Sequence, residues 1–203
     1  MYMVLTSTVL AYALGLPLGI VLVVTARGGI RPAHWLYKAL DIFINIVRSL
    51  PFLILLLAVS PITRFITGTT IGSEATVVPL VISAAPFIAR LVESSFKEVD
   101  RGVVEAAQSM GASPSQIIFK VLLAEAKPSL LVGGAIAITT ILGYSAMAGF
   151  VGGGGLGDIA IRYGYNRYQT DIMLVTAALL VALVQIFQEV GMKIARRSDK
   201  RKS

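Results

Sequence analysis

The side chains that usually carry enzymatic chemistry are scarce in this 203-residue chain. It has no cysteine and a single histidine, His34, which lies in a polar segment beside an aromatic residue and suits a solvated or interfacial position. Without a thiol or a histidine cluster, no thiolate metal site, cysteine nucleophile or Ser/His pair can be assembled. The glycine-rich run 152–157 has the composition of a phosphate loop, but no Gly-Lys-Ser/Thr follows it. The sequence therefore predicts no catalytic residue, no metal site and no cofactor held by this chain.

The segment 100–116 is suited instead to docking against another protein. Asp100 is a candidate N-cap, and apolar residues follow it at helical spacing. Gly111 stands where that helix should end, because a residue at this position usually has a positive φ, which glycine adopts without a Cβ clash. Ser113 and Gln116 have the spacing of a capping box for a second helix. The pattern predicts a helix, a glycine elbow and a helix, which together form a compact knob.

The elements that position this knob are membrane spans. The chain is 56% hydrophobic and only 14% charged, whereas soluble domains are about 25% charged. A helical span needs about 20 mainly apolar residues. Five stretches qualify, at about 3–25, 40–61, 76–92, 129–150 and 173–190. We therefore expect residues 1–203 to form one all-α, polytopic membrane domain with five transmembrane helices and a central loop at about 96–127.

Charged residues within or beside the spans have two interpretations. Arg48 lies in the second predicted span, and a charge inside a span indicates function by default. In the interpretation that the sequence favours, the crossing starts near Ser49 and Arg48 reaches the headgroups. Arg90 and Glu93 are three residues apart on one helix face, so we expect an interfacial ion pair there.

Small residues indicate where helices approach one another. Gly15 and Gly19 in the first predicted span form a small-xxx-small step that permits close helix packing. The fourth predicted span is rich in glycine and alanine, which places it in contact with protein rather than lipid. Tyr144 and Met147 share a face of that span, with Ser145 beside them, and we predict that these three residues line a translocation pathway. The alternative is that they pack statically against neighbouring spans.

The central loop carries a motif made of Glu105, Ala106, Ala107 and Gly111. This motif, at this place between two spans, resembles the EAA loop of ABC importer permeases. The resemblance implies that the central loop at about 96–127 is a cytoplasmic coupling-helix loop. Val121 stands where that family has isoleucine, which is a mild change. Ala124 replaces a proline and therefore loses a fixed φ, and we expect Pro128 to provide the break before the next span.

Further stretches resemble the methionine-uptake branch of that family, and they lie at 48–52, 85–90, 143–147 and 154–157. Together the matches run from about Gly15 to the last span. The resemblance implies a permease that works as a homodimer, with two ATPase subunits that bind the ATP and an extracytoplasmic substrate-binding lipoprotein. It also implies that the four motif residues couple transport to the ATPase, and that the substrate is methionine or another small amino acid or related ligand.

The distribution of positive charge predicts the orientation in a bacterial inner membrane. Of the 18 lysines and arginines, all but Arg64, Arg162 and Arg167 fall on the side of the central loop and the C-terminal tail. The positive-inside bias then places the N-terminus outside and the tail, 193–203, in the cytoplasm. The net charge of +7 is thereby explained by contact with anionic lipid, and no nucleic-acid partner is predicted.

Two other classes of membrane protein fit the sequence less well. An ion-coupled secondary transporter usually has buried carboxylates and an internal repeat. Here Glu93 and Glu189 lie at span ends, and no repeat is visible. An intramembrane enzyme is disfavoured by the missing catalytic groups. Because the chain also lacks a Walker-type lysine loop, the energy for transport is expected to come from another protein.

Overall fold

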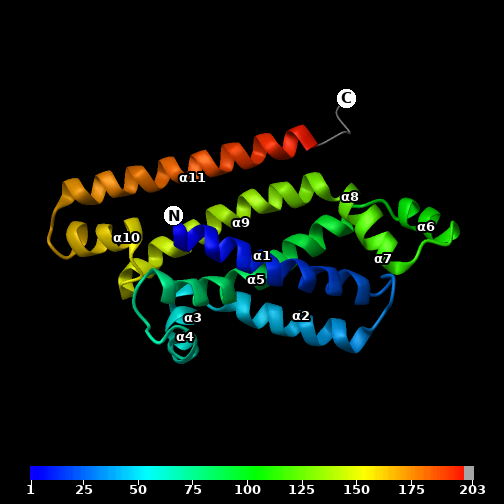
Figure 1. Ribbon diagram of the computed structural model, residues 1–203, viewed down its shortest axis with the longest axis horizontal. Helices are drawn as coiled ribbons and strands as arrows, with labels where there is room; N and C mark the ends of the chain where they lie inside the picture. The colour runs from blue at the N-terminus through cyan, green and yellow to red at the C-terminus, as the bar shows by residue number, and fades with distance from the viewer. Residues whose placement is uncertain (199–203) are drawn as a thin grey trace.

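The computed structural model describes residues 1–198, and within them the chain is helical without a β-strand. Four helices are long and apolar enough to cross a membrane, and a bent pair of helices could supply a fifth crossing. The four are α1 (Tyr2–Thr25), α5 (Ser73–Lys97), α9 (Lys127–Met147) and α11 (Thr170–Ser198). They lie roughly along the longest axis of the molecule (Figure 1). The expected all-α polytopic fold is confirmed.

Helices α1 and α5 have the most extensive contact of any helix pair described. A Cβ atom added to Gly15 would lie 2.7 Å from the carbonyl oxygen of Ala85, and one added to Gly19 would lie 2.6 Å from the Cβ atom of Val92. Only glycine permits the two backbones to approach this closely. The close packing predicted at the two glycines is therefore confirmed, and α5 is the partner.

The second predicted span, 40–61, is broken in the structure. Helix α2 (His34–Ser49) ends before Pro51, and α3 (Phe52–Ala58) leaves it at an angle of 105°. Leu50 is extended, with ψ at 127°, as expected for the residue before a proline. The span predicted at 40–61 is therefore made of two helices rather than one, because the residue before a proline favours the extended region. A short helix, α4 (Ser60–Thr67), then completes the turn toward α5.

The central loop contains the predicted knob. Helix α6 (Arg101–Ser109) begins at Asp100, whose side chain accepts a hydrogen bond from the Gly102 amide at 2.6 Å. Ser113 and Gln116 form the predicted capping box at the start of α7 (Pro114–Gln116). The chain continues through a π-helical segment, Ile117–Leu122, and through α8 (Leu123–Glu125) into α9. In Figure 1, α6 and α7 project from one end of the bundle.

The glycine-rich stretch between α9 and α11, expected to be a loop, is largely helical. It contains a 3₁₀ segment, Ala148–Val151, then α10 (Gly155–Ile159) and a π-helical segment, Ala160–Tyr165. Its glycines allow close packing: a Cβ atom added to Gly153 would lie 2.7 Å from the Thr76 hydroxyl. The stretch thereby docks on the start of α5 at the end of the bundle opposite α6 (Figure 1). The last part of the predicted basic tail, residues 199–203, lies outside the described residues. It contains Lys200, Arg201 and Lys202.

Candidate functional site

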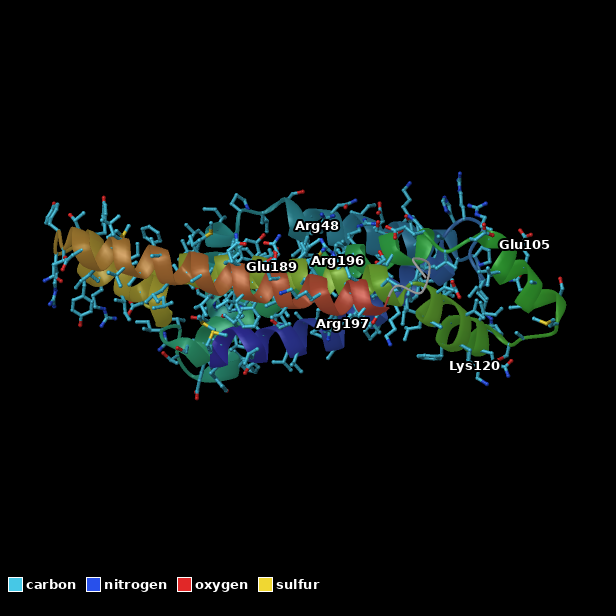
Figure 2. All side chains as sticks on the ribbon, turned by 90° about the horizontal axis from the view of Figure 1, so that it is seen from above. Arg48, Glu105, Lys120, Glu189, Arg196 and Arg197 are labelled. Atoms are coloured by element: carbon cyan, nitrogen blue, oxygen red, sulfur yellow. The ribbon has the colours of Figure 1, made fainter. Side chains whose placement is uncertain are left out.

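The motif residues of the central loop divide between an anchored face and an exposed face of α6. Ala107 is buried in the main hydrophobic core, and Val104 packs against the same cluster. Glu105 and Ala106 are exposed, as is Met110 at the end of the helix. Figure 2 shows Glu105 at the extremity of the molecule, on the end where Lys120 also lies. The geometry therefore presents a rigidly seated helix whose free face is available to a partner.

Gly111 makes the turn between α6 and α7. Its φ is +76°, in the left-handed region, and its amide donates to the carbonyl of Gln108 at 2.9 Å. The next amide, of Ala112, donates to the carbonyl of Ala107 at 3.0 Å. These bonds satisfy carbonyl groups that the end of a helix leaves free. The predicted glycine elbow is thus present, and it determines the direction in which the chain leaves α6.

The three predicted pathway residues have different surroundings. Tyr144 stacks in parallel on Phe52 of α3, with ring centroids 4.7 Å apart. Ser145 is buried, and its hydroxyl donates to the carbonyl of Leu142 at 2.7 Å. Met147 is 45% exposed in this single chain. The structure therefore leaves Tyr144 and Met147 on partly open surface and turns Ser145 into the bundle.

A charged network between α2 and α5 is more extensive than the sequence indicated. The expected ion pair of Arg90 with Glu93 is present at 2.6 Å. Arg90 also pairs with Asp41 of α2, and Glu93 also pairs with Lys97 at 2.7 Å. Tyr37 of α2 donates to Glu93 at 3.1 Å. The Glu93 side chain is only 4% exposed, whereas the Lys97 side chain is 56% exposed. The network is therefore buried at Glu93 and open at Lys97, and it fastens α2 to α5.

We predict that Glu93→Gln lowers the free energy of unfolding by about 3 kcal/mol, because the buried Glu93 carboxylate is the shared partner of Arg90 and Lys97 and only Asp41 remains to pair with Arg90. Glutamine keeps the shape of the side chain, so the decrease in the free energy of unfolding measures the contribution of the Glu93 charge. Glu74→Gln is the control, since Glu74 is exposed in the first turn of α5 and should contribute less than about 1 kcal/mol through the helix dipole. Denaturation of both variants in detergent measures the difference, and equal stabilities would contradict the prediction.

With this geometry established, comparison with known proteins assigns the family. Residues 15–198 match the family described as the inner membrane component of binding-protein-dependent transport systems. The chain belongs to this family. It is therefore a multi-pass permease component of an importer and not an enzyme in its own right, as the resemblance of the EAA-type motif implied.

Within this family, the chain is similar to permeases that are named for methionine transport. The chain is 53% identical over 201 residues to a probable D-methionine transport system permease protein of Vibrio cholerae, covering 99% of this chain and 89% of that protein. It is 41% identical over 180 residues to a methionine import system permease protein of Bacillus subtilis, covering 89% and 81%.

The fold is also similar to a chain in the inward-facing structure of a methionine ABC transporter. The TM-score is 0.96 at 45% identity, with 98% of this chain and 92% of that chain covered. The helical arrangement therefore belongs to a known permease architecture.

Proposed function

We propose that this chain is the permease subunit of an ATP-driven methionine importer in the bacterial inner membrane. The observation that carries the proposal is its 53% identity, over 99% of its length, to a probable D-methionine permease. The match between this fold and that of a methionine ABC transporter chain supports it.

In this proposal the complete importer also contains further subunits. A second copy of this chain completes the translocation pathway, and two ATPase subunits on the cytoplasmic side bind and hydrolyse ATP. A substrate-binding lipoprotein delivers methionine from outside. The charge distribution supports an N-terminus outside and the α6 end in the cytoplasm, where the ATPases are.

Coupling works through α6 in this proposal. Glu105, Ala106, Ala107 and Gly111 form the knob that the ATPase holds, with Ala107 seating it on the core and the exposed Glu105 able to meet a basic side chain of the partner. Closure of the two ATPases around ATP displaces the knob. Because the chain leaves α6 in a direction set by the Gly111 turn, that displacement passes through α7 and α8 into α9.

The pathway proposal for Tyr144, Ser145 and Met147 predicts that their accessibility depends on nucleotide. Cysteine placed at each position is the only cysteine in this chain. Its labelling by a water-soluble thiol reagent should differ between nucleotide-free and ATP-trapped complexes, because the spans move around the pathway. Ala137→Cys, at a fully buried position of α9, should stay unlabelled in both states. If the three test positions behave like this control, they are packing residues.

Growth of a methionine auxotroph tests the transport function in cells. A strain that lacks other methionine uptake should require this gene to grow on low concentrations of methionine. Restoring the gene should restore growth, whereas a copy truncated before α9 should not. Unchanged growth without the gene, or rescue only by a different amino acid, would contradict the substrate assignment.

A further inference from the structure

Arg48 lies deeper along the bundle than the sequence suggested. Helices α2 and α5 are antiparallel, because Tyr37 contacts Glu93 and Asp41 contacts Arg90. Arg48 is seven residues beyond Asp41, which is about 10 Å at the helical rise of 1.5 Å per residue.

The end of α5 at Lys97 lies the same distance from Arg90 in the opposite direction. Arg48 is therefore about 20 Å from the charged end of α5, in a hydrocarbon layer of about 30 Å. It is level with the middle of α5, and Figure 2 shows it far from Glu105 at the end of the molecule. The interpretation in which Arg48 reaches the headgroups is thus not supported by its register.

The side of α2 that carries Arg48 is not its apolar side. A spacing of seven residues places Arg48 on the same helix face as Asp41, which binds Arg90. The opposite face consists of exposed apolar side chains, namely Ile42, Phe43 and Ile46. That apolar face suits contact with lipid. The face with Arg48 therefore points away from lipid, toward protein or water.

Arg48 has no partner among residues 1–198. Its side chain is exposed, and it makes none of the hydrogen bonds or ion pairs found within this part of the chain. By contrast, Arg90 of α5, which meets the other end of this α2 face, is bound by Asp41 and Asn45 of α2 and by Glu93 of its own helix. Placing an arginine in the middle of a membrane span costs free energy unless the side chain faces a water-filled cavity or an opposite charge. Arg48 is thus positioned to receive an anion from outside this chain.

The break after α2 is followed at once by an aromatic contact with α9. Four residues after Arg48, Phe52 begins α3 and stacks on Tyr144 of α9. Helices interrupted within a membrane commonly form substrate sites in transporters, because the interruption exposes polar groups at depth. Here a cation, a helix interruption and one ring of a stacked pair occur within the five residues 48–52, and the other ring is supplied by α9.

We propose that Arg48 binds the carboxylate of the transported amino acid midway through the membrane, while Tyr144, held by its stacking on the buried Phe52, contacts the apolar side chain. The guanidinium group suits this role because it can bind a carboxylate through two parallel hydrogen bonds. The inference rests on the proposed transport function but not on methionine in particular, since every α-amino acid carries the same carboxylate.

Chemical restoration of the charge tests this proposal in the full complex. Arg48→Cys is reconstituted with its ATPase and binding protein, and uptake of radiolabelled methionine is measured. We expect uptake to fall about tenfold or more, as loss of a charge-assisted hydrogen bond implies. Aminoethyl methanethiosulfonate, which adds a positive charge, should restore much of the uptake. The negatively charged sulfonatoethyl reagent should not. Treated wild-type complex and Arg64→Cys, on exposed α4, are the controls and should keep their uptake.

Three other results would each overturn the proposal. A cysteine at position 48 that neither reagent reaches would show that Arg48 faces lipid or a closed contact with the second copy. Labelling with equal effects of both reagents would show a steric role only. Uptake that Arg48→Gln leaves unchanged would show that no carboxylate binds there. Failure of the proposed function is distinguishable, because the wild-type complex would then accumulate no methionine in the same assay.

Discussion

Replacing Gly111 with valine should lower ATP-driven uptake by about fivefold to thirtyfold, while ATP hydrolysis by the complex continues. The left-handed conformation costs an L-residue roughly 1–2 kcal/mol, and a β-branched residue is a genuine outlier there. A Cβ atom at this position would meet no other atom within 4 Å. The effect must therefore come from the backbone, as the turn between α6 and α7 shifts toward a negative φ and the knob loses its fixed direction.

Gly111→Asn is the matched control for this prediction. Asparagine adds a side chain to the same open space but tolerates the left-handed region. Uptake and hydrolysis, both measured in proteoliposomes, should remain coupled in this variant. Coupling in the valine variant at the wild-type level would show that the turn does not transmit motion.

Gly19→Ala should destabilise the permease, because α1 and α5 pack closely at this glycine. The new methyl group would lie 2.6 Å from the Cβ atom of Val92 and 2.7 Å from the carbonyl oxygen of Ala89. Neither atom can move without shifting the α5 backbone. Overpacking of this kind typically costs about 1–3 kcal/mol, and we expect a fall of several degrees in the melting temperature in detergent.

Gly133→Ala in α9 is the matched control for Gly19→Ala in α1. Its new methyl group would lie 3.5 Å from the Leu91 Cβ atom, which is an ordinary contact. Alanine also favours a helix over glycine, so this variant should be as stable as the wild type or more so. Equal melting temperatures for Gly19→Ala and Gly133→Ala would contradict the close approach of α1 and α5.

The features that the sequence predicted well are those governed by local rules. Spans follow from the thickness of the bilayer, so the long helices were expected at nearly their observed places. The knob was predicted from Asp100, Gly111, Ser113 and Gln116, because caps and left-handed glycines have strong residue preferences over short distances. The motif there also carried the family resemblance.

The features that the sequence missed depend on contacts between distant segments. Asp41 and Arg90 are 49 residues apart, and no local pattern indicates that they meet. The stacking of Phe52 on Tyr144 likewise needs the three-dimensional arrangement. The break at Pro51 did have a local signal, since the residue before a proline avoids the helical region, but the apolar residues on both sides were interpreted as one span.

Transport by this chain is tested most directly by uptake of radiolabelled methionine into proteoliposomes that contain the chain with its ATPase and its binding protein. We predict ATP-dependent accumulation that excess unlabelled methionine abolishes. We also predict that the isolated chain neither accumulates methionine nor hydrolyses ATP. ATP hydrolysis by the isolated chain, or accumulation driven by an ion gradient without the ATPase, would contradict the proposed function.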